Sequence, residues 1–478
     1  MIKKTLLTIA AAAAVWPAMT AKVILPSLIG DNMVLQQQSD ARLWGKADPS
    51  SKIDITTSWD GKTYTTYADR TGEWCMAVRT PAASSEPSTI TFDDGDKTVI
   101  GNVLIGEVWY CSGQSNMEIP VRGYKHQPIE GSLQTIIHAK ADKPIRMFTV
   151  EKAVSSTPLD SCGGHWGLNT PAEVAECSAT AYFFAEEINE MLDNVPVGLI
   201  ISVWGGTDFQ PWMSTEAAAK FDLKYPTPTE PVDRSTPEVL RMASTLYNSM
   251  AAPVLPYTIK GMLWYHGENN CYDPEEYEKL MPEFVKCMRD GFQRPDMPFY
   301  YVQIAPFGGY GNVEHNVAKQ RLVQSRLMNQ TDNCGMVVTM DIGDRDCIHP
   351  ANKREVGRRL AYWALAKDYG KNDFAYSGPI FNRMEWDGKR AILWFDNTGG
   401  GVSPLEVDLA GFEAAGEDGV WHRARGRVEC ETGTLSVYCD EIGEIKAVRY
   451  GHLPYFEATL FDNFGLPASP FVTNGRLE

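Results

Sequence analysis

One serine follows an apolar stretch of the kind that forms a buried strand. Residues 103–111 are β-branched and aromatic, and the stretch stops at Ser112-Gly113, so the chain is expected to leave a sheet and turn. A helix beginning near Ser115 would direct its free backbone N–H groups at an oxyanion formed there. The pattern therefore predicts a nucleophile at Ser115, although a serine that only caps a helix gives the same local sequence.

A possible base and acid lie more than 200 residues downstream. The segment Asp346-Cys347-Ile348-His349 carries a carboxylate and an imidazole three positions apart, a spacing that one turn of backbone can bring together. Histidine is the natural general base near neutral pH, and a carboxylate would fix its tautomer and stabilise its protonated form. Ser115, His349 and Asp346 thus make a complete set for acyl transfer, with Asp344 as the alternative acid.

Two further segments offer groups for an oxyanion hole. Gly205 and Gly206 follow the apolar run 197–203, and glycine lets backbone N–H groups approach a reacting atom closely. Asn270 ends another strand-like run that turns polar, and its side-chain amide is a second donor. A tight turn and a self-bonded asparagine are the structural alternatives. Because ligand sites in open α/β sheets lie beyond the carboxyl ends of strands, the repeated pattern favours a single site there.

Other chemistries lack their signatures in this chain. The residues after Ser115 are Asn116 and Met117, not the second glycine of a G-x-S-x-G elbow. There is no H-E-x-x-H, the eight histidines are scattered, and the glycine patterns of dinucleotide and P-loop sites are missing. No metal and no cofactor are therefore expected.

The N-terminus and the charge bear on location and partners. Lys3 and Lys4 precede a short apolar run over 6–15 and small residues to Ala21, which predicts a cleaved signal peptide over 1–21 and a periplasmic or secreted protein. No stretch is long and apolar enough to predict membrane insertion. Removing 1–21 deletes two lysines and no acid, so the formal charge would change from −17 to −19, which argues against a nucleic-acid partner.

Hydrophobic patterning divides the mature chain into three predicted domains. Short alternating segments over 22–102 predict a β-sandwich, strands alternating with helices over 103–370 predict an α/β domain, and 371–478 return to β patterning. Two cysteine pairings are conceivable, Cys430 with Cys439 across a hairpin and Cys271 with Cys347 near the site, but free thiols are the favoured interpretation.

The blocks that carry these residues resemble the SGNH hydrolase superfamily and, within it, the sialate O-acetylesterase family. They are, in order, residues 25–36, the Ser115 block, Trp204-Gly-Gly-Thr207, Trp264-Tyr-His-Gly-Glu-Asn-Asn270, Asp341-Ile-Gly-Asp344 with Ile348-His-Pro350, and 465–471. The resemblance implies a three-layer α/β/α domain between two β-sandwiches. It implies Ser115 as nucleophile, His349 as base, Asp346 as acid from the D-x-x-H spacing, and oxyanion donors from the Ser115 amide, Gly205 or Gly206, and Asn270.

The chain departs from the family pattern at His266, where glutamine is usual, and at Asn269, where a small residue is usual. The possible substrate contacts are Gln114, Asn116, Arg122, His266 and Glu268. Arg122 is a candidate cation for an anionic sugar, with a solvated surface arginine as the equally open alternative. The implied function is a secreted serine esterase that removes O-acetyl groups from a sugar or glycan, with 9-O-acetylsialate as the expected substrate. An esterase for acetylxylan or another glycan, and a non-catalytic glycan-binding protein, are the alternatives.

Overall fold

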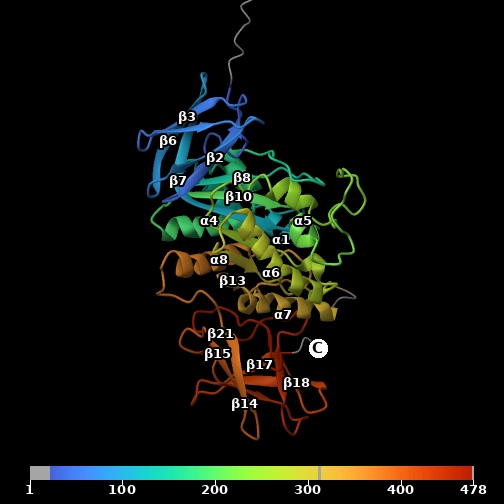
Figure 1. The fold of residues 1–478 in the computed structure, drawn as a ribbon. Helices are drawn as coiled ribbons and strands as arrows, with labels where there is room; N and C mark the ends of the chain where they lie inside the picture. Colours follow the sequence, from blue (N-terminus) through green and yellow to red (C-terminus); the bar gives the residue numbers. More distant parts are fainter. Residues whose placement is uncertain (1–21, 311–313, 476–478) are drawn as a thin grey trace, which may run out of the picture.

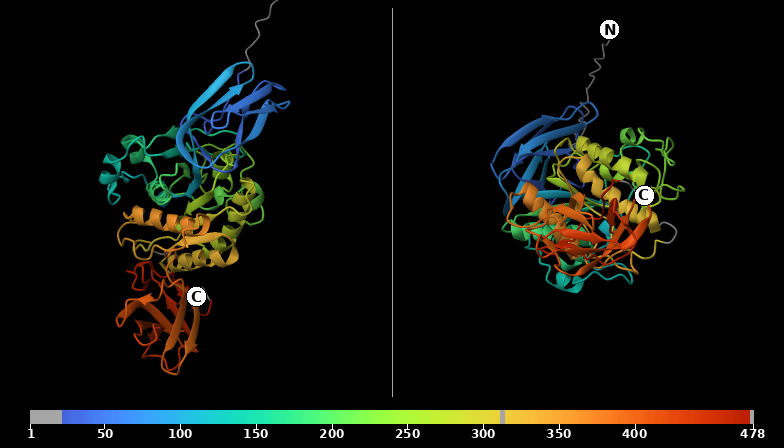
Figure 2. Two further views of the ribbon diagram at one scale, coloured as in Figure 1. Left: turned by 90° about the vertical axis from the view of Figure 1, so that its left-hand side faces the viewer. Right: turned by 90° about the horizontal axis from the view of Figure 1, so that it is seen from below.

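The computed structural model describes residues 22–310 and 314–475, which form three parts arranged along one long axis (Figure 1). A β-rich N-terminal part is followed by a central sheet with helices and then by a C-terminal β domain, and the same succession is visible after a quarter turn (Figure 2). The predicted signal peptide, residues 1–21, lies outside the described residues.

The N-terminal part consists of two small sheets that face each other. Its strands are β1 (Val34–Gln36), β2 (Asp40–Lys46), β3 (Lys52–Thr57), β4 (Thr63–Tyr67), β5 (Glu73–Arg79) and β6 (Ser84–Asp93). β2 pairs with β5, whereas β3 pairs with β4 and β6. The ring of Trp74 on β5 lies 5.7 Å from that of Phe92 on β6, centroid to centroid, and both rings belong to a hydrophobic core that is otherwise mainly aliphatic.

One long strand joins this part to the central sheet. The first half of β7 (Lys97–Gly113) pairs with β6, and its second half lies between two parallel strands of the central sheet. The domain boundary predicted after residue 102 therefore falls inside a continuous strand. Sequence patterning does not reveal this, because both halves of the strand have the same β-rich composition.

The central sheet is parallel and buried on both faces. It consists of β8 (Ile145–Thr149), β10 (Val197–Val203), β11 (Gly261–Tyr265), β12 (Phe299–Val302) and β13 (Cys334–Val337), in the order β13-β12-β11-β7-β10-β8, with β9 (Trp166–Gly167) antiparallel at the edge. Every residue of β10, β11 and β12 is buried. Two-sided burial explains why these segments read as unbroken apolar runs in the sequence.

Helices cover both faces of this sheet. On one face α4 (Ala179–Met191) and α8 (Lys353–Asp368) pack together, and Phe184 of α4 meets Trp109 of β7 with ring centroids 4.9 Å apart. On the other face lie α6 (Pro274–Gly291) and α7 (Glu314–Gln330). Phe284 of α6 contacts Trp264 of β11, with ring centroids 4.6 Å apart. The predicted three-layer α/β/α fold is confirmed.

Short helices occupy the connections between these elements. They are α1 (Ser115–Glu118), α2 (Ser132–Ile137), α3 (Pro171–Glu176), α5 (Thr215–Ala218), η1 (Gln210–Trp212), η2 (Tyr247–Ala251) and η3 (Glu268–Asn270). Three of them, α1, η1 and η3, follow the carboxyl ends of β7, β10 and β11, so they lie where the site is expected.

The C-terminal part is a β domain with its own hydrophobic core. Its seven-stranded sheet has the order β14 (Ile380–Trp386), β15 (Ala391–Asp396), β19 (Leu435–Tyr438), β18 (Trp421–Val428), β17 (Asp408–Ala415), β20 (Ala447–Tyr450) and β22 (Phe471–Val472), and β16 (Val402–Ser403) pairs separately with β21 (Phe461–Asp462). The expected return to β structure is confirmed.

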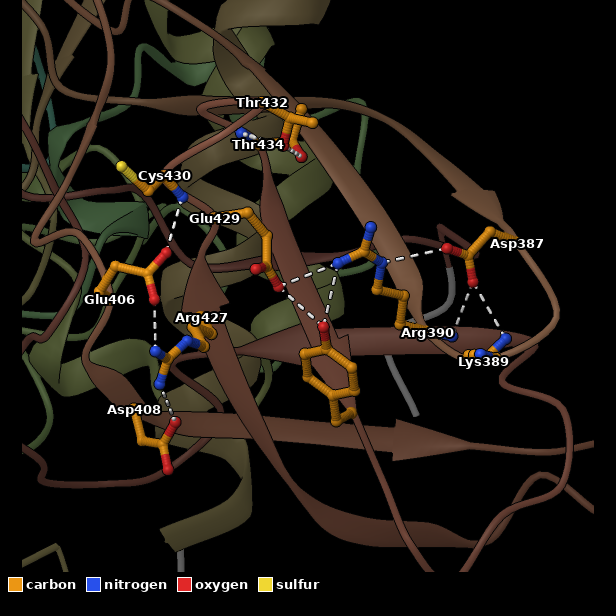
Figure 3. Close-up of polar contacts among 11 residues, drawn as sticks. Asp387, Lys389, Arg390, Glu406, Asp408, Arg427, Glu429, Cys430, Thr432 and Thr434 are labelled. Atoms are coloured by element: carbon orange, nitrogen blue, oxygen red, sulfur yellow. Dashed lines mark hydrogen bonds and ion pairs between the residues drawn. The ribbon is translucent and has the colours of Figure 1, made fainter.

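The predicted hairpin near Cys430 exists, but it does not bring the two cysteines together. β18 and β19 pair antiparallel with Arg425 opposite Tyr438, which leaves Cys430 in the turn. The Cys430 backbone N–H donates to Glu406 at 2.8 Å, beside the ion pair of Glu406 with Arg427 (Figure 3). All ten cysteines, including Cys271 and Cys347, are free thiols, as favoured from the sequence.

Candidate active site

Three strands of the central sheet end at the same level. In the parallel register Gly113 of β7 lies beside Val203 of β10 on one side and Tyr265 of β11 on the other. The chain builds β8 and β10 on one side of β7 and then β11, β12 and β13 on the other, so the strand order reverses here. Ligand sites of open α/β sheets lie at such switch points, beyond the carboxyl ends of the strands.

Gly113 allows the chain to turn sharply before the serine. Its φ is +142°, and a Cβ there would lie 2.2 Å from the carbonyl oxygen of Tyr265. No larger residue fits beside that carbonyl, because real Cβ contacts do not approach so closely. The turn ends at Ser115, the first residue of α1, with Gln114 as N-cap.

Ser115 and His349 form a hydrogen-bonded pair. Ser115 Oγ lies 2.8 Å from His349 Nε2, although 234 positions separate the two residues. His349 lies on the loop between β13 and α8, which ends above the same edge of the sheet. The Ser115 hydroxyl points to the imidazole, so the geometry suits transfer of its proton to Nε2.

The second nitrogen of the imidazole has an amide partner in place of the predicted carboxylate. His349 Nδ1 lies 2.7 Å from Gln127 Oε1, so Nδ1–H donates to the amide oxygen and the Nε2 lone pair faces Ser115. This contact corrects the prediction that Asp346 is the acid partner of His349. Asp346 is exposed. Asp344 is not the partner either: its Oδ1 accepts the backbone N–H groups of Asp346 and Cys347 at 2.7 and 3.1 Å.

The surroundings of His349 favour its neutral form. Burial, together with the nearby cation of Lys353, lowers the pKa of His349 from 6.5 to about 4. The edge of the Tyr124 ring packs against the imidazole with centroids 5.6 Å apart. Since no carboxylate in the described ranges contacts the ring, none offsets these effects on its pKa, and the base is unprotonated and ready to accept a proton at neutral pH.

Gly205 reaches the site, but its amide is engaged by a carboxylate. A Cβ at Gly205 would lie 3.1 Å from the Cβ of Ser115, so the glycine packs directly against the nucleophile. Its N–H donates to Oε2 of Glu118, three residues after Ser115 on α1. The other oxygen of Glu118 accepts from Lys152 Nζ at 2.5 Å. The Gly205 amide is therefore available to an oxyanion only when Glu118 withdraws.

The other predicted oxyanion groups bond to neighbouring loops. Asn270 Oδ1 accepts the backbone N–H of Phe209 at 3.0 Å, and its Nδ2 lies 3.4 Å from Gln210 Oε1. The carbonyl of Gly206 accepts from Asn269 Nδ2 at 2.9 Å. These contacts fasten the segment after β10 to the segment after β11, so the structure gives Asn270 and Asn269 a supporting role in this state.

His266 is an internal residue. It is fully buried, its ring stacks on Trp264 with centroids 5.2 Å apart, and burial lowers its pKa to about 3. Its Nε2–H donates to the carbonyl of Thr207 at 3.1 Å. The prediction that His266 contacts substrate is therefore wrong for this conformation, because no face of the ring is open.

Gln114, Asn116 and Glu268 are also internal, with exposed fractions of 1%, 0% and 7%. They bond to one another beneath Ser115 and do not face solvent. The sequence singled out these residues as substrate contacts because they adjoin the nucleophile in the same blocks. Burial contradicts that role.

Arg122 lines a cavity whose walls include residues that contact the site, although neither Ser115 nor His349 lines it. The cavity has a volume of about 330 Å³, and its lining includes Glu118, which bonds the Gly205 amide, and Tyr124, which contacts His349. Arg122 Nε pairs with Glu176 at 2.7 Å, and Lys152 pairs with Glu118. The cavity is of a size to admit a monosaccharide, and both of its cations already have carboxylate partners.

Two broader features of the described residues bear on function. Across residues 22–310 and 314–475, no helix has the length and apolar character needed to span a bilayer. Over the same ranges no three side chains of histidine, cysteine, aspartate or glutamate gather closely enough to hold a metal ion.

Comparison with known proteins gives consistent similarities. Residues 105–366 match the family model described as "Carbohydrate esterase, sialic acid-specific acetylesterase". The chain is 26% identical over 411 residues to the sialate O-acetylesterase of Homo sapiens, covering 77% of this chain and 75% of that protein, and 27% identical over 431 residues to that of Mus musculus, covering 77% of each. The crystal structure of a carbohydrate acetylesterase from Xanthomonas citri superposes with a TM-score of 0.85 at 32% identity, over 95% of this chain and 100% of that one.

Proposed function

The chain belongs to the sialic acid-specific acetylesterase family of carbohydrate esterases, and from this premise we propose that it is a serine esterase that removes O-acetyl groups from sialic acid, with 9-O-acetylsialate as substrate. The observation that carries the proposal is the 2.8 Å contact between Ser115 Oγ and His349 Nε2 at the carboxyl end of β7. A non-catalytic glycan-binding protein would not need a serine hydroxyl hydrogen-bonded to an imidazole, so this pair argues against that alternative.

The reaction runs in two acyl-transfer steps. Ser115 Oγ attacks the acetyl carbonyl carbon while His349 Nε2 takes the hydroxyl proton, and His349 then returns this proton to the sugar oxygen as the C–O bond breaks. Water attacks the acetyl-serine with the same base, and acetate leaves. The Ser115 amide, and the Gly205 amide once Glu118 has withdrawn, stabilise the oxyanion of each tetrahedral intermediate.

Gln127 orients the base in this scheme. Because it accepts from Nδ1–H, it selects the tautomer that leaves Nε2 free for Ser115. A neutral amide supplies no counter-charge for the imidazolium. The proposed machinery is thus a serine–histidine pair with an amide partner.

Replacing Gln127 by alanine is expected to lower kcat about tenfold, since one hydrogen bond contributes roughly 0.5–1.5 kcal/mol. Gln127→Glu introduces a carboxylate at Nδ1, which raises the pKa of His349 and moves the acid limb of kcat/KM to higher pH. Asp346→Asn is the matched control, and we expect its rate to equal that of the wild type. Steady-state kinetics on an aryl acetate measures all three. A large loss in Asp346→Asn with no loss in Gln127→Ala would restore Asp346 as the acid.

The substrate proposal is tested by acetate release. Arg122 and Lys152 are the cations at the cavity that are available to pair with a sialate carboxylate, by exchange with Glu176 and Glu118. We expect faster release from 9-O-acetylsialate than from acetylxylan at equal ester concentration, with Ser115→Ala as the blank. Faster release from acetylxylan would favour the alternative of another glycan ester.

We also propose that the protein is exported. The charge and apolar pattern of residues 1–21 support this, and they predict a mature chain that starts near Lys22 in the periplasm or medium. N-terminal sequencing of the protein recovered from those fractions measures the cleavage point. Full-length protein retained inside the cell would contradict export.

A further inference from the structure

A group of buried polar side chains lies beneath the nucleophile and takes no part in the reaction described above. It consists of Gln114, Asn116, Glu268 and Lys353, which we call the buried clamp. The exposed fraction of none exceeds 7%, and Asn116 and Lys353 are fully buried. Burying a carboxylate and an ammonium costs several kcal/mol per ion unless each is paired and hydrogen-bonded. Hydrogen bonds within the clamp, from Gln114 and Asn116 to Glu268 and from Lys353 to Asn116, offset part of this cost.

The Glu268 carboxylate holds both sides of the nucleophile. Its Oε2 accepts from Gln114 Nε2 at 2.8 Å, and its Oε1 accepts from Asn116 Nδ2 at 2.5 Å. Gln114 and Asn116 are the residues directly before and after Ser115. One carboxylate, from the turn η3 that follows β11, thus fixes the backbone on either side of Ser115.

Asn116 connects the nucleophile to the base. Its Nδ2 also donates to the carbonyl of Ile348 at 3.1 Å, and its Oδ1 accepts from Lys353 Nζ at 2.5 Å. Ile348 comes directly before His349, and Lys353 is the first residue of α8, four positions after it. The loop that carries the base is therefore tied to Asn116 on both sides of His349.

The clamp also acts electrostatically on His349. Burial lowers the pKa of Lys353 to about 7, an effect that the charge of Glu268 partly opposes. Lys353 in turn helps to lower the pKa of His349. Among the residues that the structure describes, the other side chains in contact with the imidazole are Ser115, Gln127 and Tyr124, none of which is charged at neutral pH.

We propose that Glu268, through Asn116 and with Lys353, is a positioning unit that sets the Ser115 hydroxyl against the His349 ring. These residues do not touch substrate, because they are buried below the serine. The proposal rests on the proposed role of Ser115 and His349 and adds the reason why three distant segments must carry these polar residue types.

Glu268→Gln is the first test, because it keeps the shape of the side chain. The new side chain has one oxygen and one NH₂ group where Glu268 has two oxygens. The NH₂ group would face Gln114 Nε2 or Asn116 Nδ2, which are also donors, so one of the two hydrogen bonds to the carboxylate is lost. We expect kcat on an aryl acetate to fall about 10- to 100-fold while KM changes less than about twofold. Glu278→Gln is the matched control: Glu278 on α6 pairs with Arg326 of α7, its side chain is 21% exposed, and we expect its kcat to stay at the wild-type value.

Lys353→Met provides a readout that a purely structural role would not change. Removing the cation raises the pKa of His349, so the acid limb of kcat/KM is expected to move to higher pH, in addition to a fall in kcat. Loss of packing alone would lower the rate equally at every pH. This variant also decides the matter if Glu268→Gln does not fold, which circular dichroism and the thermal midpoint of each variant would reveal.

The two proposals fail in different ways. If the wild type does not hydrolyse the aryl acetate and a serine-reactive phosphonate does not label Ser115, the proposed reaction is wrong. If the wild type is active but Glu268→Gln keeps kcat within twofold, or Lys353→Met leaves the acid limb in place, the buried clamp is not a positioning unit.

Discussion

Replacing Ser115 by alanine is expected to lower kcat for acetate release by roughly 10⁴- to 10⁶-fold, with the protein still folded. The hydroxyl is the atom that forms the acyl-enzyme, and no other serine side chain contacts His349 in the described part of the chain. The small side chain of alanine leaves the turn at Gly113 and the helix α1 undisturbed. Steady-state hydrolysis of an aryl acetate and of 9-O-acetylsialate measures the loss.

The matched control for Ser115→Ala is Ser132→Ala. Ser132 begins α2, and its backbone N–H donates to the carbonyl of Ile129, so its alanine variant should keep the wild-type rate. Labelling by a serine-reactive phosphonate, located by mass spectrometry, should appear at Ser115 in the wild type and in Ser132→Ala. Wild-type activity in Ser115→Ala would mean that the nucleophile lies elsewhere.

Replacing His349 by alanine is expected to cause a loss of similar size, about 10⁴- to 10⁶-fold in kcat. Ser115 then has no base, and its hydroxyl is a poor nucleophile at neutral pH. Since the two residues act as a unit, the double variant Ser115→Ala/His349→Ala should be no slower than either single variant. Additive losses in the double variant would contradict a shared proton transfer.

The wild-type pH profile is part of the same expectation. His349 must be neutral to accept the proton, and its pKa lies near 4, so kcat/KM should be flat around neutral pH and fall as the pH drops through about 4. His138, exposed at the end of α2, is a control position whose alanine variant should keep this profile. An acid limb near pH 6.5 would mean that the imidazole is solvated and lacks the surroundings described for it.

Much of the architecture follows from local patterns. The apolar run 197–203 coincides with β10, and the helices expected between strands over 103–370 are present, among them α4. These predictions succeed because strands buried on both faces must be apolar throughout, and because helices on such a sheet need an apolar stripe. The segments that follow the strands were also identified, since polar residues and glycine must replace the apolar run where a strand ends.

The hydrogen-bond partner of His349 could not be predicted from the spacing of residues in the sequence. The D-x-x-H pattern assumes that a carboxylate three residues away turns back to the imidazole. Here the loop instead winds around Asp344, which accepts the N–H groups of Asp346 and Cys347, and Asp346 faces outward. Gln127 reaches Nδ1 from 222 positions away, and a single glutamine outside any block carries no signal in the sequence.

The roles of the residues beside Ser115 also depend on the tertiary structure. Gln114, Asn116 and Glu268 were identified as functional from their blocks, yet their burial gives them an internal task. Glu118 and Lys353, which act on the oxyanion donor and on the base, lie three and four residues from Ser115 and His349 but were not identified. Residue type alone does not say whether a polar side chain faces the cavity or the interior.

The layered fold, the resemblance to an esterase family, and the serine and histidine of the proposed reaction can all be inferred from the amino-acid sequence, because each depends on patterns within short segments. Three features appear only once the chain is folded: the amide partner of His349, the carboxylate that binds the Gly205 amide, and the burial of the clamp. Each of these features requires side chains from distant segments to contact one another in a buried environment of low dielectric constant. The packing of β7, β10, β11 and α8 determines which side chains do so.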